Sequence, residues 1–129
     1  ATSTGGVYIE ASGSLSINAD DLVLTVLGGP GNQFGLIFMG PGLQGPVQLG
    51  DGLRCVAAPL LRFPARPSNA QGTWSEGPGL VAYGNLAFPP PNPLMSGSTW
   101  HFQAWTRDPF GPCSNFSNLS SALSLTFEP

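Results

Sequence analysis

WHFQAWTR, residues 100–107, is the strongest strand signal in the chain. Aromatic residues recur along it, and a β-strand points successive side chains to opposite faces. One face carries Trp100, Phe102, Ala104 and Thr106, which we expect to lie in the core. The other face carries His101, Gln103, Trp105 and Arg107. The stretch therefore predicts a β-strand with one buried face and a second face of different chemistry.

Shorter runs of the same kind occur on both sides of this strand, and Gly and Pro separate them. With 18 Gly and 14 Pro, the chain has no room for an uninterrupted amphipathic helix of normal length. The expected strands lie within residues 7–11, 14–17, 21–27, 33–39, 47–49, 53–57, 60–63, 73–75, 80–88, 100–107 and 123–127. Within one of them, Gly35 is expected to mark a bulge or a close approach of another segment.

This pattern predicts an all-β fold, a single-domain antiparallel β-sandwich of about seven to ten short strands, with a jelly roll as one version. Residues 1–129 would form this one domain, and residues 1–6 would be a flexible N-terminal arm. A chain of this length buries roughly two-thirds of its unfolded surface, which is enough for a core.

The charge content is low. Only 9% of residues are charged, against about 25% in an average soluble domain. The four cations are all Arg and the net charge is −3, so no basic patch for nucleic acid or anionic membranes can form. No apolar run reaches the ~18 residues that span a membrane. Weak charge repulsion favours packing against copies of the chain or against other surface proteins.

Two cysteines, Cys55 and Cys113, suggest one disulfide bond and an oxidising compartment. In the chain-entropy model, such a bond would stabilise the fold by about 4 kcal/mol. Two free buried thiols are the alternative. The chain opens with a polar segment and without Met, as expected of a processed chain such as one trimmed after export.

Three C-terminal motifs resemble a known kind of module. They are WHFQAWTRDP at residues 100–109, SNFSN at 114–118 and LSLTF at 123–127. Upstream, DLVL at 21–24, GLIF at 35–38 and LGDGLRCV at 49–56 follow the same pattern in order. The chain resembles, over residues 7–129, a module near the C-termini of secreted planctomycete-type bacterial proteins. The resemblance implies export, a cell-surface or extracellular setting and a non-catalytic role.

Catalytic and metal-binding patterns are sparse. His101 is the single histidine, and no G-x-S-x-G motif accompanies it, so we expect no enzyme and no cofactor. One His and two distant Cys lack the ligand spacing of a zinc site. Asp20 and Asp21 are weak calcium candidates, and the alternative is that this acidic pair caps a turn.

The second face of residues 100–107 offers a candidate ligand surface. His101, Gln103, Trp105 and Arg107 combine a flat ring with planar donors, which is what sugar binding uses. The alternative is a framework role, in which Trp105 packs under a loop and Arg107 pairs with Asp108, Asp51 or a carbonyl group. A carbohydrate-binding module is therefore the second function considered, with a polysaccharide as the partner.

The N-terminal segment suggests a different function. Val7, Tyr8 and Ile9 are β-prone and follow an uncharged stretch, so they could add as an assembly arm to the sheet edge of a neighbouring copy. The alternative is that residues 7–11 pair within their own domain. The sequence thus predicts a secreted structural or cell-surface module that acts by protein–protein contact, for example as the subunit of an extracellular filament.

Overall fold

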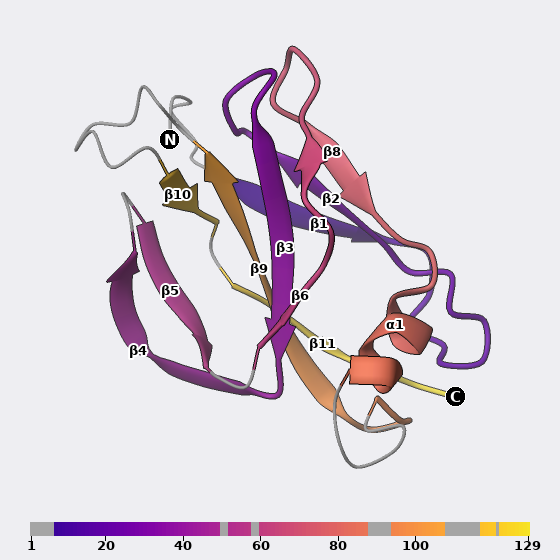
Figure 1. Cartoon of the computed structure of the whole chain (residues 1–129). Helices are drawn as coiled ribbons and strands as arrows, with labels where there is room; N and C mark the ends of the chain where they lie inside the picture. The colour runs from indigo at the N-terminus through magenta and orange to yellow at the C-terminus, as the bar shows by residue number, and fades with distance from the viewer. Residues whose placement is uncertain (1–6, 50–51, 58–59, 88–93, 108–116, 121) are drawn as a thin grey trace.

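Short strands separated by turns make up most of the structure, a computed structural model (Figure 1). It describes residues 7–49, 52–57, 60–87, 94–107, 117–120 and 122–129. The strands are β1 (Tyr8–Ser12), β2 (Val23–Leu27), β3 (Phe34–Gly40), β4 (Gly42–Leu49), β5 (Gly52–Ala57), β6 (Leu61–Arg62), β7 (Arg66–Pro67), β8 (Trp74–Glu76), β9 (Thr99–Arg107), β10 (Ser117–Leu119) and β11 (Leu123–Thr126). The helix of the described part is α1 (Leu80–Ala87).

Two antiparallel sheets form the body of the protein. The smaller has the order β1-β2-β8, and the larger has the order β10-β9-β3-β6, with β11 also paired to β9 and β7 to β3. Strands β3 and β9 lie at the centre, where Gly35 faces Thr106 and Gly40 faces His101. The predicted all-β sandwich is confirmed. The described strands divide into sheets of three and six plus a β4–β5 hairpin, which differs from the eight-strand plan of a jelly roll.

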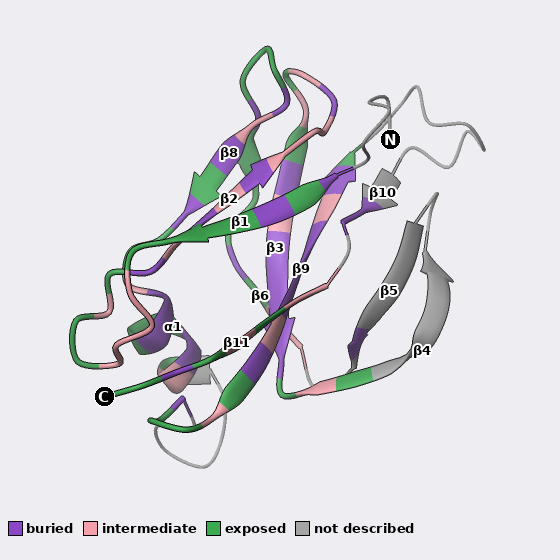
Figure 2. Cartoon of the chain, turned by 180° about the vertical axis from the view of Figure 1, so that it is seen from behind, coloured by how far each residue is buried: buried purple, intermediate pink, exposed green. Residues whose placement is uncertain are grey.

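The main core lies between the two sheets. The alternation predicted for β9 is confirmed, because Trp100, Phe102, Ala104 and Thr106 are all at most 4% exposed. Ile37 and Met39 of β3 lie in the same core, as do Leu24 and Val26 of β2. Figure 2 shows these buried stretches of β3 and β9 behind the strands of the smaller sheet.

A second apolar cluster covers the opposite face of the larger sheet. Phe38 of β3, Val56 of β5 and Leu119 of β10 are its buried members, and Trp105 of β9 is partly buried against them. The β4–β5 hairpin, with Leu49 opposite Gly52, thus packs on the far side of the sheet from the main core. Both faces of β9 are therefore covered in its middle part. The candidate ligand face is not open to solvent there.

The segment within residues 80–88 was expected to contain a strand, and this prediction is wrong. Residues Leu80–Ala87 form helix α1. Asp20 caps the helix, since its two carboxylate oxygens accept hydrogen bonds from the N–H groups of Val81 and Ala82 at 2.9 and 3.1 Å. The sequence directly before α1 is Gly-Pro-Gly and offers no capping side chain, so the helix start has no local signal.

The remaining differences concern the limits of strands. The expected strand at 14–17 is reduced to one bridge between Ser16 and Glu128, next to a turn. Strand β4 begins at Gly42, inside a Pro- and Gly-rich stretch that lies outside the expected strands, and its pairing with β5 is shifted between Leu43 and Val47. Strands β7 and β10, of two and three residues, were not predicted.

Thr106 is a buried residue whose hydroxyl is not matched by a partner. It is 1% exposed, and its Oγ1 has no hydrogen-bond partner in the described part. We expect Thr106→Val to raise the free energy of unfolding by about 1 kcal/mol, because a desolvated hydroxyl without a partner is replaced by a methyl group of similar shape. Urea unfolding followed by circular dichroism measures the change.

A matched control lies on the same strand. The hydroxyl of Thr99 is 2.7 Å from that of Thr126, so Thr99→Val removes a hydrogen bond at an exposed site and should be neutral or slightly destabilising. A Thr106→Val variant less stable than the wild type would show that the buried hydroxyl is bonded in the native state.

Candidate functional site

Gln103 of the predicted ligand face is not accessible. It is fully buried, and its Nε2 donates a hydrogen bond of 2.6 Å to the backbone oxygen of Ser120. The hydroxyl of Ser120 in turn accepts a 2.9 Å hydrogen bond from the N–H of Ala104. The amide of Gln103 therefore holds the chain that follows β10 against β9, and it cannot meet an external sugar without unfolding this contact.

The other residues of this face have different surroundings. Trp105 is partly buried in the second apolar cluster, whereas Arg107 is exposed at the end of β9. Asp51 and Asp108, the acids considered as partners for Arg107, lie outside the described residues. The structure does not bring Gln103, Trp105 and Arg107 together as one open surface, because Val56 of β5, Leu119 of β10 and Ala122 cover the middle of it.

His101 pairs with a serine of the neighbouring strand. Its Nδ1 is 2.6 Å from the hydroxyl of Ser124, which lies directly opposite it in the β9–β11 ladder. The two residues are cross-strand neighbours, which by itself accounts for the contact. Within the described ranges, no three His, Cys, Asp or Glu residues come close enough together to hold a metal ion.

The two acids proposed as weak calcium ligands have separate partners. Asp20 caps helix α1, as described above. Asp21 accepts hydrogen bonds from the hydroxyl of Ser14 at 2.6 Å and from its backbone N–H at 3.1 Å. The structure thus favours the alternative interpretation, in which these side chains cap backbone segments, and it does not converge them on a cation.

Ser14 lowers the pKa of Asp21, first through its hydroxyl and then through its backbone N–H. A lowered folded-state pKa means that this contribution to stability is complete above the unfolded pKa of about 3.9 and is lost as the pH falls through the folded value. We expect Ser14→Ala to move the pKa of Asp21 back upward, because the hydroxyl contact is the larger cause. Carboxyl-carbon NMR titration measures it, and an unchanged pKa would contradict the assignment.

The proposed assembly arm belongs to its own domain. Tyr8 and Ile9 lie in β1, where they pair with Leu27 and Val26 of β2. Val7 and Ile9 are buried in the main core, since they are 6% and 9% exposed. The alternative, pairing within the domain, is what the structure has, because these apolar side chains complete the core. Residues 1–6 lie outside the described residues.

The predicted disulfide is only partly within the described chain. Cys55 lies in β5. Cys113, its expected partner, lies outside the described residues.

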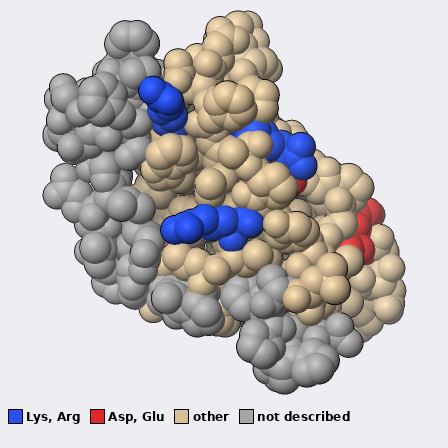
Figure 3. All heavy atoms as spheres, in the orientation of Figure 1, with Lys and Arg blue, Asp and Glu red and all other residues tan. Residues whose placement is uncertain are grey.

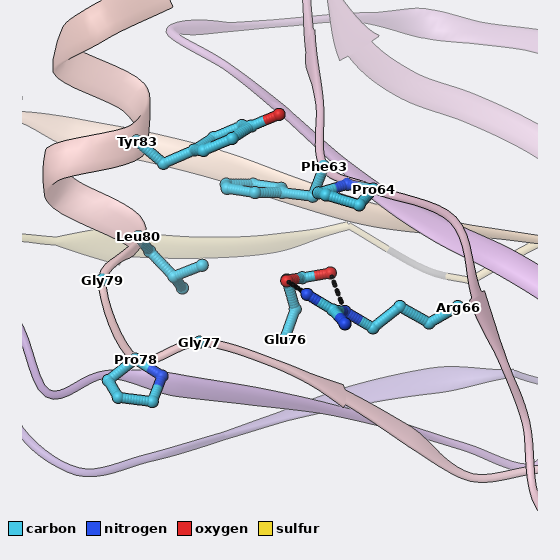
Figure 4. Close-up of a pocket in the computed structure, with 9 residues that line it drawn as sticks. All are labelled: Phe63, Pro64, Arg66, Glu76, Gly77, Pro78, Gly79, Leu80 and Tyr83. Atoms are coloured by element: carbon cyan, nitrogen blue, oxygen red, sulfur yellow. Dashed lines mark hydrogen bonds and ion pairs between the residues drawn. The ribbon is translucent and has the colours of Figure 1, made fainter.

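A pocket opens where residues 63–66, the turn after β8 and the first turns of α1 meet (Figure 4). Its volume is about 280 Å³, and its lining consists of Phe63, Pro64, Arg66, Glu76, Gly77, Pro78, Gly79, Leu80 and Tyr83. In the figure, the rings of Phe63 and Tyr83 lie on one side and the Arg66–Glu76 pair on the other. The pocket therefore has an apolar wall facing a polar one.

The apolar wall is a stacked aromatic pair. The ring centroids of Phe63 and Tyr83 are 5.0 Å apart, and their planes are inclined by 29°. Phe63 is buried, whereas Tyr83 is 40% exposed and therefore presents ring surface to solvent. Leu80, one helical turn before Tyr83, is 2% exposed and anchors α1 in the main core.

The polar wall is a two-bonded ion pair. Nε and Nη2 of Arg66 each donate a 2.9 Å hydrogen bond to one carboxylate oxygen of Glu76. The side chain of Glu76 is 6% exposed and that of Arg66 is 48% exposed. The hydrogen bonds and the charge of Glu76 raise the pKa of the Arg66 guanidinium. Because β7 belongs to the larger sheet and β8 to the smaller, the pair joins the two sheets at one edge.

Sequence reasoning did not single out these residues. Phe63 and Arg66 come from one stretch of the chain and Glu76 and Tyr83 from another, and only the fold brings the two stretches together. The available signal was the Gly77-Pro78-Gly79 turn, in which both glycines have positive φ angles of 105° and 98°. That turn places Glu76 and Leu80 side by side along the pocket.

Comparison with known proteins finds no significant match to a protein-family model, a curated protein or a solved structure. Among the described residues, no helix has both the length and the apolar character needed to cross a membrane.

Proposed function

We propose that the protein is a secreted, non-catalytic module of the cell surface or extracellular space that acts by protein–protein contact between copies of the chain. The observation that carries this proposal is the outer edge of the smaller sheet at β1, which pairs with no second strand of the described residues. The resemblance of its motifs to a module of secreted bacterial proteins supports export. The low charge of the chain, 9% of its residues, supports close packing of copies.

The outer edge of β1 is available for pairing. The sheet order β1-β2-β8 makes β1 an edge strand, and in the described part it pairs only with β2. Tyr8, Glu10, Ala11 and Ser12 are exposed along it. Such an edge presents backbone N–H and C=O groups that a strand from another chain can pair with. Glu10 is the only charge on β1, so repulsion along the edge is small.

The opposite edge of the same sheet is different. There, β8 is joined to β7 of the larger sheet by the Arg66–Glu76 pair. Strand β8 also has only three residues, so this edge offers a shorter row of backbone groups than the five-residue β1. The asymmetry directs association to β1.

The surface offers little charge to hold copies apart. In Figure 3, most of the described surface on the face shown is uncharged, the arginines lie apart from one another, and acidic atoms appear at the right-hand rim and beside one arginine. Natural β-proteins commonly protect edge strands with lysines, and this chain has no Lys at all. Contact between copies is therefore supported by both the open backbone edge and the uncharged exterior.

Sedimentation velocity over a wide range of protein concentrations tests the proposal. We expect the average mass of the wild type to rise with protein concentration. A Tyr8→Lys, Ala11→Lys double variant should stay a monomer at all concentrations, because lysines on both copies would repel each other along the edge. A wild type that stays monomeric at the highest concentration would overturn the proposal.

Leu86→Lys is the matched control. Leu86 is the most exposed large apolar residue of the described part, at 89%, and it lies on α1, away from β1. This variant should associate like the wild type. If it becomes monomeric while the β1 variant still associates, the contact is made by the helix and the assignment to β1 is wrong.

The bond between Cys55 and Cys113 remains part of the proposal for an extracellular protein. Alkylation of the folded and the denatured protein without reduction, followed by mass spectrometry, tests it. We expect no alkylated thiol before reduction and two after it; two alkylated thiols before reduction would refute the bond.

A further inference from the structure

The pocket between Tyr83 and the Arg66–Glu76 pair has the chemistry of a small-ligand site. We propose that it binds a single neutral sugar unit, such as the terminal residue of a glycan. This inference is independent of the contact proposed at β1, because the pocket lies at the β8 edge of the smaller sheet and β1 forms the other edge.

The size of the pocket fits one ring. Its volume of about 280 Å³ lies just below the range of about 300–1,000 Å³ that is typical of pockets for drug-sized ligands. Two exposed prolines, Pro64 and Pro78, form part of its rim. A sugar ring can enter such a space, whereas a longer chain would have to continue over the surface.

The charges of the pocket favour a neutral ligand. Arg66 and Glu76 are the charged residues in its lining, and they neutralise each other through two hydrogen bonds. An anion would meet the nearby carboxylate of Glu76, and a cation would meet the guanidinium group of Arg66. A neutral molecule with hydroxyl groups avoids electrostatic repulsion from either charged group and can still form hydrogen bonds in the pocket.

The hydrogen-bonding groups of the polar wall match hydroxyl groups. Two N–H groups of Arg66 are used by Glu76, and the remaining ones project from a side chain that is 48% exposed. The side chain of Glu76 is only 6% exposed, so the guanidinium group is the accessible part of the pair. The oxygens of adjacent sugar hydroxyls can accept hydrogen bonds from the remaining N–H groups of this planar donor.

The aromatic wall matches the other surface of a sugar. The C–H groups of a pyranose ring form an apolar face that packs on aromatic rings. Tyr83 is 40% exposed at the pocket and is held in place by its stacking on buried Phe63. Helix α1, which carries Tyr83, is fixed by the cap from Asp20. The ring is thus held in position before a ligand arrives, which lowers the entropy cost of binding.

NMR titration of the full chain tests the proposal, with the methyl glycosides of glucose, galactose, mannose and N-acetylglucosamine as probes. We expect at least one glycoside to shift the amide signals of Gly77, Gly79 and Leu80 in a saturable manner. Tyr83→Ala should weaken its binding about tenfold, because the ring contact is lost. Tyr83→Phe, which keeps the ring, should bind like the wild type.

Tyr8→Ala is the control for nonspecific contact with tyrosine. Tyr8 is exposed to a similar degree, 42%, but lies on β1, so its loss should not change the titration. If no glycoside shifts these amides, or if the shifts persist unchanged in Tyr83→Ala, the sugar site is refuted. The sugar site is also refuted if a proline-rich peptide shifts these amide signals and no glycoside does. None of these outcomes bears on self-association, which sedimentation measures.

Discussion

Gly35→Ala is expected to lower the free energy of unfolding by about 3 kcal/mol, because the added methyl group has no space. A Cβ at this position would lie 2.5 Å from Cη2 of Trp74 and 2.8 Å from the backbone oxygen of Trp105. Trp74 belongs to the smaller sheet and Trp105 to the larger. The two sheets would have to separate locally, and urea unfolding followed by tryptophan fluorescence would report the loss.

Two further variants identify the cause of this loss. Gly29→Ala is the control, since its Cβ would meet no atom closer than 3.4 Å, an ordinary contact, and its stability should be nearly unchanged. Trp74→Phe added to Gly35→Ala removes the indole atoms nearest to the new methyl group and should restore part of the stability. A Gly35→Ala variant as stable as the wild type would show that the sheets do not meet at this residue.

Gly35 illustrates how far the sequence could predict the packing. A glycine inside a strand indicated either a bulge or a close approach, and the structure shows a close approach, because the indole of Trp74 packs over it. The choice could not be made from local sequence, since Trp74 lies on another strand of another sheet. The alternation of β9, in contrast, was predictable because the period of two is a property of the strand itself.

Helix α1 shows where local reasoning fails. Its residues alternate poorly, and its start is signalled by Asp20, about sixty positions earlier in the chain. The same residue was a calcium candidate because carboxylate oxygens in one turn are typical calcium ligands. Its role became evident only when the fold placed its carboxylate at the first N–H groups of the helix.

The candidate pocket was beyond sequence reasoning for a related reason. Arg66 and Glu76 are ten positions apart and lie in different sheets, and neither belongs to a recognisable motif. The sugar-binding chemistry was sought instead on β9, where ring and donors are neighbours in sequence. That face is covered because the β4–β5 hairpin packs over it, and the first strand of this hairpin begins in Gly- and Pro-rich residues, 42–46, that lie outside the expected strands.

Gln103→Ala is expected to lower the free energy of unfolding by about 2–4 kcal/mol, for two reasons that add. The side chain is fully buried, so its removal leaves a cavity. Its Nε2 also bonds to the backbone oxygen of Ser120 at 2.6 Å, and that oxygen would lose this donor in a site without water access. Loss of the bond should release the segment after β10 from β9, which amide hydrogen exchange at Ala104 and Ser120 would detect.

Comparison with Arg107→Ala, on the same face of β9, distinguishes a structural role of this face from a role in ligand binding. Arg107 is exposed at the end of β9, so its truncation should leave stability within about 0.5 kcal/mol of the wild type. If this face bound a ligand, Gln103→Ala and Arg107→Ala would both be as stable as the wild type, and both would lose sugar binding. If Gln103→Ala proves as stable as Arg107→Ala, the segment after β10 does not seal this face in solution, and His101, Gln103, Trp105 and Arg107 again become the first place to look for a glycan.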